Sequence, residues 1–236
     1  MAGETDPNRS LSDSLELADW RRQIADLYAE VRRLMAADVD AALELWRTTR
    51  ERLFREHPQS PVPAAERAAF WARHYPADPS LRFEVAVMAD AARPPTDSEL
   101  GGLGGLGGLG ELDGLAMDLP VSGGGSMSFS RIGQVEVPFT SGPRRLGVYW
   151  MAGYAGGIFV PFRDATSGSE TYAAGRYLLD SAKSADLGGN LEHGSLVLDF
   201  NFAFQPSCAF DPKWACPLAP PENRLDIPIR AGERLA

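Results

Sequence analysis

The sequence predicts an α+β fold, in which N-terminal helices pack on an antiparallel β-sandwich or small β-barrel. In the first third of the chain, apolar residues recur three and four positions apart, a spacing typical of amphipathic helices. From Met127 onward, short runs rich in aromatic and β-branched residues follow one another, separated by Gly, Pro, Ser and Asp. Strands without intervening helices favour an antiparallel sheet, and helices gathered at one end of the chain indicate the α+β class.

Composition and charge exclude several classes of protein. The 236 residues are 44% hydrophobic and 23% charged, which suits one globular domain with appendages or two small domains. A net charge of −9 and the lack of a clustered Lys/Arg surface argue against nucleic acid as a partner. No apolar run approaches the roughly 20 residues that span a bilayer, and the N-terminus lacks the basic and apolar regions of a signal peptide. We therefore expect a cytoplasmic protein with no membrane partner.

The first predicted helix carries an apolar stripe. Six residues three and four positions apart share one of its faces, namely Leu17, Trp20, Ile24, Leu27, Val31 and Leu34. The stripe has two interpretations. Either it docks on the protein's own core, or it forms a coiled-coil seam that makes a homodimer through residues 15–35.

Two further helices are expected before the β-rich part. The second covers about Asp40 to Arg55, and the three prolines of "EHPQSPVP" end it, because proline removes a backbone donor and fixes the backbone. Its buried side is expected to carry Leu45, Trp46, Thr49 and Leu53. The segment "AAERAAFWARHY" predicts a short third helix.

A glycine-rich segment interrupts the predicted sheet. "LRFEVAVMAD" is strand-like, but the Gly-Gly-Leu repeat that follows holds neither helix nor strand well, because each glycine loses backbone entropy on ordering. We therefore predict a disordered insertion over about residues 94–126, between two strands of one sheet. These glycines do not indicate a phosphate-binding loop, since no Lys-Ser/Thr follows them.

Five runs after the insertion predict the strands of the β part. They are "MSFSRIGQVEVPF", "RRLGVYWMAG", "GIFVPFRDA", "TYAAGRYLLD" and "GSLVLDFNFAF". Short strands of this kind, joined without helices, are typical of a sandwich or a small barrel.

Two motifs in the C-terminal half are specific enough to suggest a family. The pattern F-x-D-x-T-[ST]-G-x-x-T-Y-x-x-G-R-Y falls on residues 162–177, and D-F-N…P-x-C-A-[YF]…C-P-L-x-P-x-E-N-x-L falls on residues 199–225. On these motifs the chain resembles a bacterial and archaeal family known as domain of unknown function 1684. The resemblance covers about residues 40–236, without the glycine-rich segment. It implies a helical extension over 1–37 and a single α+β domain over 38–236, interrupted at about 94–126, but no mechanism.

Buried charge is expected around Arg176. If "TYAAGRYLL" is a strand, Tyr172 and Arg176 share a face, and an Arg on a packed face requires a carboxylate or an anionic ligand. Asp199 in "LVLDFNFAF" is the expected partner, either in a structural ion pair or at the floor of a polar pocket. Asp164 is expected to fix a turn, because an Asp side chain accepts from backbone donors two residues on.

The two cysteines of the chain, Cys208 and Cys216, have three interpretations. They are reduced packing residues, or a disulfide that closes a short loop and contributes roughly 2.5 kcal/mol, or half of a metal site. The metal site would need His193, Asp199 or Glu222 as further ligands.

We expect residues 205–225 to form a proline-stiffened hairpin with both thiols reduced and no metal bound. A nucleophilic cysteine is not expected, because none of the three histidines belongs to a motif that ties it to a thiol.

The expected function is the binding of a small polar molecule in a polar pocket of the C-terminal half. Glu222 and Asn223 follow two prolines and are expected to be held rigidly beside Asp199 and Arg176. The predicted ligand-binding residues are Arg163, Asp164, Tyr172, Arg176, Asp199, Asn201, Glu222 and Asn223.

Two alternatives from other classes stay open. The first is a hydrolase-type enzyme that uses Asp199 and Glu222 as acid and base, which would require a carboxyl group of raised pKa. The second is a non-catalytic interaction module that dimerises through the N-terminal helix. The sequence indicates no cofactor and does not decide between binding and catalysis.

Overall fold

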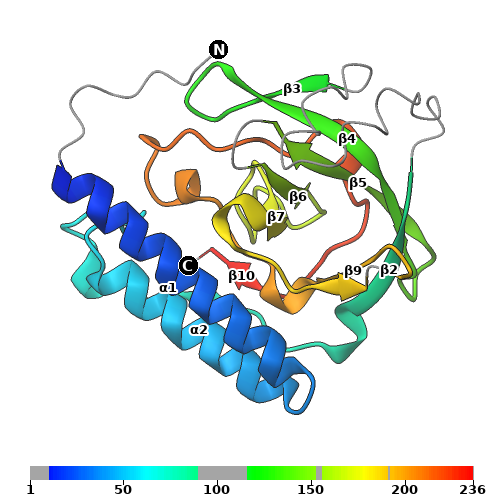
Figure 1. The fold of residues 1–236 in the computed structure, drawn as a ribbon, viewed down its shortest axis with the longest axis horizontal. Helices are drawn as coiled ribbons and strands as arrows, with labels where there is room; N and C mark the ends of the chain where they lie inside the picture. Colours follow the sequence, from blue (N-terminus) through cyan, green and yellow to red (C-terminus); the bar gives the residue numbers. More distant parts are fainter. Residues whose placement is uncertain (1–10, 90–115, 153–155, 191, 236) are drawn as a thin grey trace. The chain divides into compact units, whose positions relative to one another are not determined.

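The computed structural model describes residues 11–89, 116–152, 156–190 and 192–235, and it confirms the α+β class (Figure 1). The chain forms two compact units, Met1–Trp71 and Ala72–Ala236. The first unit holds the long helices and the second holds the sheet. Both long helices thus belong to one unit, whereas the family resemblance suggested a boundary after residue 37.

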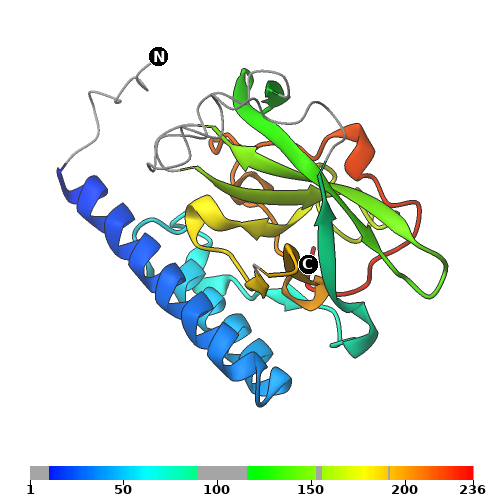
Figure 2. The same ribbon diagram turned by 45° about the vertical axis from the view of Figure 1, so that its right-hand side comes forward.

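The helical unit is a hairpin of α1, Leu11–Met35, and α2, Val39–Glu56, which lie side by side (Figures 1 and 2). The short connection ends at Asp38, whose carboxylate caps α2 by accepting from the Ala41 amide at 2.9 Å. Between the helices, Trp46 Nε1 donates to Tyr28 Oη at 3.1 Å. Both helices are confirmed, but the predicted buried side of α2 is only partly right: Trp46 and Leu53 are buried, whereas Leu45 and Thr49 are half-buried.

The apolar stripe of α1 is buried in part. Ile24, Leu27 and Val31 are buried as predicted, whereas Leu17, Trp20 and Leu34 are half-buried, and Tyr28 and Met35 also belong to the buried face. Trp20, also on the stripe, stacks on Phe54 of α2 with 6.1 Å between ring centroids. These contacts agree with docking inside one chain, and the homodimer through residues 15–35 stays a prediction.

The third predicted helix is wrong. Only Arg67–Ala69 form a 3₁₀ turn, η1, and Arg73–His74 form the strand β1. No residue of η1 is buried, so no apolar face stabilises a longer helix. The Arg67 guanidinium instead fixes a loop by donating to the carbonyl groups of Pro58, Ser60 and Val62.

The second unit is built on an eight-stranded sheet of order β7-β6-β5-β4-β2-β9-β8, with β3 paired to β4, all antiparallel. The strands are β2 (Arg82–Met88), β3 (Ala116–Pro120), β4 (Ser126–Val137), β5 (Arg144–Met151), β6 (Gly157–Phe162), β7 (Arg176–Asp180), β8 (Gly189–Asn190) and β9 (Ser195–Asp199). Within the described residues β7 and β8 do not pair with each other, so the sheet is open and sandwich-like and the barrel alternative is wrong. A separate pair joins β1 to β10 (Glu233–Arg234).

Two predicted strands are shorter than expected. "TYAAGRYLLD" contributes only β7, because residues 172–175 form a turn in which the Gly175 amide donates to the Tyr172 carbonyl at 2.9 Å. "GSLVLDFNFAF" ends as a strand at Asp199, which caps the 3₁₀ turn η5, Phe200–Phe202, by accepting from the Asn201 amide at 2.9 Å. Tyr172 and Arg176 therefore do not share a strand face.

The insertion predicted at about 94–126 lies mostly outside the described residues. Its last part is ordered, because β3 pairs with β4 across a turn at residues 121–125. Leu119 is 2% exposed and anchors this strand in the core despite the glycines near it. The ordered sheet thus starts earlier than the glycine content suggested.

Aromatic side chains fill the interior of the β unit. Phe159 of β6 meets Tyr177 of β7 edge to face at 4.7 Å between centroids, and Phe162 meets Phe200 in the same way at 5.3 Å. Tyr177 also donates from Oη to the Pro217 carbonyl. The core therefore fixes the ends of β6, β7 and β9, where most of the predicted site residues lie.

Gly175→Ala is expected to destabilise the β unit more than Gly124→Ala. Both glycines have positive φ, 100° and 84°, which costs a residue with a side chain about 1–2 kcal/mol. At Gly124 an added Cβ meets nothing within 4 Å, whereas at Gly175 it would lie 2.3 Å from the Phe162 carbonyl oxygen. Urea midpoints of the two variants measure the difference. Equal midpoints would mean that the approach to Phe162 relaxes without cost.

Candidate functional site

Asp164 organises a tight turn directly after β6. Its carboxylate accepts from the Thr166 amide at 3.3 Å, from Thr166 Oγ1 at 2.8 Å and from Ser167 Oγ at 3.2 Å. The amide bond is the turn contact expected from the sequence. The same carboxylate also accepts from the Ile229 amide at 2.7 Å, so it holds the C-terminal segment as well.

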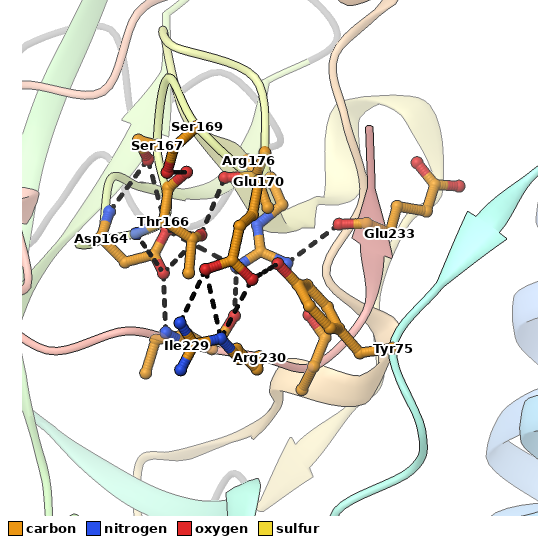
Figure 3. Close-up of polar contacts among 12 residues, drawn as sticks. Tyr75, Asp164, Thr166, Ser167, Ser169, Glu170, Arg176, Ile229, Arg230 and Glu233 are labelled. Carbon is orange, nitrogen blue, oxygen red and sulfur yellow. Dashed lines mark hydrogen bonds and ion pairs between the residues drawn. The ribbon is translucent and has the colours of Figure 1, made fainter. Parts of the chain in front are cut away.

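Arg176 lies beside this turn with 1% of its surface exposed. Its guanidinium donates to the carbonyl oxygens of Ile229 at 2.7 Å, of Glu233 at 3.0 Å and of Ala231, and Nη2 lies 3.6 Å from Asp164 Oδ1 (Figure 3). Burial lowers the pKa of Arg176, and the charge of Asp164 opposes this shift. One carboxylate and three backbone carbonyls thus compensate for the desolvated cation.

The expected ion pair between Arg176 and Asp199 is wrong, because β7 and β9 are not neighbours in the sheet. Asp199 instead lies opposite Arg82 of β2, with 3.8 Å between Oδ2 and Nη1, and accepts from Asn201 Nδ2 at 2.8 Å. Asn201 also binds both backbone groups of Asp78 at 2.8 Å. Burial raises the pKa of Asp199 against the hydrogen bonds from Asn201.

Asn223 joins the C-terminal loop to the sheet. Its buried amide accepts from the Gly147 amide at 2.7 Å and donates to the carbonyls of Pro161 at 2.7 Å and Gly147 at 3.0 Å. The Arg163 amide donates to the Asn223 carbonyl at 2.9 Å. Both polar ends of the Asn223 side chain are therefore used by the protein's own backbone.

Glu222, next to Asn223, is exposed and accepts from Tyr149 Oη of β5 at 2.7 Å. Its contact thus differs from those of Asp199, the other candidate acid. The structure brings the predicted site residues together in separate groups, which are Asp164 with Arg176, Asp199 with Asn201, Arg163 with Glu222 and Asn223, and Tyr172 with the cysteines.

An exposed ion pair lies beside the Asp164–Arg176 pair (Figure 3). Arg230 donates to both oxygens of Glu170, with a shortest distance of 2.7 Å, and Tyr75 Oη donates to the same carboxylate at 3.0 Å. The hydrogen bonds from Arg230 lower the pKa of Glu170. The sequence analysis missed Tyr75, Glu170 and Arg230, because they lie 60 and 95 positions apart and no local motif joins them.

Cys208 and Cys216 are neighbours inside the loop that follows η5. Both are free, 6% and 4% exposed respectively, and the Cys208 amide lies 3.3 Å from Cys216 Sγ. Ser122 frames Cys216 from the β3–β4 turn. The Cys216 amide donates to Ser122 Oγ at 3.1 Å, and the Cys216 carbonyl accepts from the Ser122 amide at 3.1 Å.

Three neighbouring side chains lower the pKa of the Cys208 thiol. The interaction with Cys216, and then those with Ser122 and Tyr172, lower this pKa to about 6 against the opposing effect of burial. The bond to Cys208 raises the pKa of Cys216, and burial adds to that shift. Burial and the bond to Cys208 raise the pKa of Tyr172 to about 12. These shifts favour the thiolate form of Cys208 and the protonated forms of Cys216 and Tyr172.

An activated cysteine was not predicted from the sequence, because no histidine belongs to a motif with either thiol. The side chains that lower the pKa of Cys208 are instead Ser122, Tyr172 and Cys216, which come from three separate segments. Only Tyr172 was among the predicted site residues. No signal in the sequence joins Ser122 to Cys216 across 94 positions.

No group of three or more His, Cys, Asp or Glu side chains is arranged to hold a metal ion in the part of the chain that the structure describes. Over the same residues, none of the helices combines the length and the apolar composition that crossing a bilayer requires.

Asp164→Asn is expected to lower the free energy of unfolding by about 3–5 kcal/mol, because it leaves Arg176 buried without its counter-charge. Urea denaturation followed by circular dichroism measures this change. The matched control is Arg230→Gln, which removes the exposed ion pair of the same cluster and is expected to move the midpoint far less. A wild-type midpoint for Asp164→Asn would contradict the anchoring role of the buried pair.

Comparisons with known proteins agree with the motifs. A family model described as protein of unknown function (DUF1684) matches residues 112–234, a shorter range than the 40–236 expected from the sequence. The chain is also similar to the solution NMR structure of an uncharacterized protein from gene locus rrnAC0354 of Haloarcula marismortui, at 26% identity and a TM-score of 0.56. The alignment covers 85% of this chain and 96% of that one. No curated protein matches the chain. The family model spans more than half of the sequence, and the chain belongs to the DUF1684 family.

Proposed function

We propose that the unit Ala72–Ala236 is a small-molecule-binding domain whose ligand is a thiol-reactive compound held at Cys208. The observation that carries this proposal is the position of Cys208, whose amide lies 3.3 Å from Cys216 Sγ and whose pKa is lowered by Cys216, Ser122 and Tyr172. Such an arrangement stabilises the thiolate, which is the nucleophilic form of cysteine. Cytoplasmic location, part of the same proposal, would keep both cysteines as thiols.

The other predicted ligand-binding residues support this choice through their contacts. Arg176 uses its Nη groups on backbone carbonyls, and the Asn201 and Asn223 amides bind backbone groups on both sides. A ligand at these positions would have to displace the protein's own buried hydrogen bonds, which costs about 1–3 kcal/mol for each group left unpaired. These residues are better suited to joining segments of the chain than to binding a ligand.

The position of the thiols is compatible with access by a small reagent. Four residues of the surrounding loop, Ser207, Ala209, Phe210 and Trp214, are only half-buried. The two sulfurs therefore lie directly below the surface, in contrast to Arg176 in the interior. A small molecule needs to move only this loop to reach Cys208.

The hydrolase alternative has one observation in its favour, the raised pKa of Asp199, which an acid catalyst needs. Its second acid, Glu222, however, contacts Tyr149, whereas Asp199 contacts Asn201 and Arg82. These contacts do not bring the two carboxylates together. We therefore rank hydrolysis below thiol chemistry.

Alkylation of Cys208 by iodoacetamide is expected to show a pH midpoint near 6, because the three donors lower the pKa of this thiol to about 6. An ordinary cysteine has a midpoint of about 8.5. The midpoint is a better readout than the rate, because nucleophilicity falls as the pKa falls, with a Brønsted slope of about 0.4–0.5. Peptide mapping by mass spectrometry identifies the labelled cysteine.

Two variants sharpen this test. Tyr172→Phe removes one donor to the thiolate and is expected to raise the midpoint, while Tyr149→Phe removes a hydroxyl that binds Glu222 and should leave it unchanged. Labelling of Cys216 before Cys208, or a wild-type midpoint of about 8.5, would overturn the proposed site.

A further inference from the structure

We propose that Cys208 and Cys216 form a redox-active dithiol that reduces small disulfides and becomes an intramolecular disulfide. The proposal rests on the proposed function, because it requires Cys208 to be the reactive thiolate. It adds the class of substrate, a low-molecular-weight disulfide, and a second reacting group, Cys216.

The two cysteines are already neighbours in the reduced protein. The Cys208 amide lies 3.3 Å from Cys216 Sγ, and both thiols are buried. A disulfide requires the sulfurs to approach to about 2.05 Å. Since the backbone of one cysteine already contacts the sulfur of the other, we infer that this closure is a local movement.

The backbone next to Cys216 is held from two sides. The neighbouring Pro217 forms a β-bridge with Val121, and its carbonyl accepts from Tyr177 Oη. Ser122 binds the amide and the carbonyl of Cys216 and donates from Oγ to the Trp214 carbonyl at 2.8 Å. Cys216 therefore stays beside Cys208 while chemistry takes place at the Cys208 sulfur.

The reaction has two exchange steps. In the first, the Cys208 thiolate attacks one sulfur of the substrate R–S–S–R, a bond forms between Cys208 and that sulfur, and the thiolate R–S⁻ leaves. In the second, Cys216 loses its proton and attacks Cys208 Sγ, and the second R–S⁻ leaves and takes up a proton. In total, the protein loses two electrons to the substrate, and one thiol R–SH and one thiolate R–S⁻, which takes its proton from water, are released.

The hydrogen bond between the cysteines orders these steps. While Cys208 is a thiolate, the bond to it raises the pKa of Cys216, which keeps Cys216 protonated. Once Cys208 is in a mixed disulfide, its sulfur carries no charge and that bond no longer favours the protonated form. Lys183 contributes in the same direction, because its charge lowers the pKa of Cys216. Cys216 is thus released for attack only after Cys208 has reacted.

The test treats the full chain with glutathione disulfide as the probe and follows intact mass without reduction. The wild type is expected to lose two hydrogen atoms and to carry no lasting adduct, because Cys216 resolves the mixed disulfide. Cys216→Ser is expected to keep one glutathione on Cys208, and Cys208→Ser is expected to gain an adduct far more slowly. Dithiothreitol should restore the starting mass in each case.

The outcomes separate this inference from the proposed function. If Cys208 is alkylated with a midpoint near 6 but the wild type stops at the glutathione adduct, the dithiol is wrong while the thiolate site stands. If Cys208 has an ordinary midpoint, both fail together. If a serine variant does not fold, the wild type is equilibrated in glutathione redox buffers instead. Reduced and oxidised wild-type protein are expected to reach the same fraction of disulfide in each buffer. A folded wild type that never forms the disulfide would overturn the inference.

Discussion

The arrangement of the C-terminal half depends on the buried guanidinium of Arg176. Taking this cation out of water is unfavourable unless its charge is matched, and the protein places Asp164 and three carbonyl groups of residues 229–233 against its Nη groups. Asp164 binds the Ile229 amide as well, so one ion pair fixes the turn after β6, the start of β7 and the C-terminal segment. Residues 229–233 lead directly into β10, which pairs with β1.

Hydrogen bonds between side chains and backbone groups also join segments in the loops that follow β9. Buried backbone groups require partners, and the loops after β9 find many of them in side-chain amides. Asn201 binds Asp78, and Asn223 binds β5 at Gly147 and β6 at Pro161. Polar residues that the sequence suggested as ligand-binding therefore act here as links between segments.

Local patterns in the sequence predict local structure, whereas partners distant in sequence are not predictable from it. The spacing of apolar residues predicts α1 and α2, and the Asp164 side chain predicts its own turn because Thr166 is two positions away. The predicted Arg176–Asp199 pair was wrong because strand order decides which residues meet, and β6, β5, β4 and β2 lie between β7 and β9 in the sheet. The carbonyl groups that bind Arg176 lie 53 to 57 positions away, so no motif indicates them.

The residues around Cys208 are held in place by these contacts. The turn that carries Tyr172 ends at Gly175, directly before the buried Arg176. The backbone that carries the Tyr172 phenol beside Cys208 is therefore held in place. Cys216 is held by Ser122, a residue of the β3–β4 turn. A histidine would activate the thiol by taking its proton, whereas these donors activate it by stabilising the thiolate that remains. Because one of the donors is itself a thiol, the group that stabilises Cys208 before the reaction is the group that can attack it afterwards.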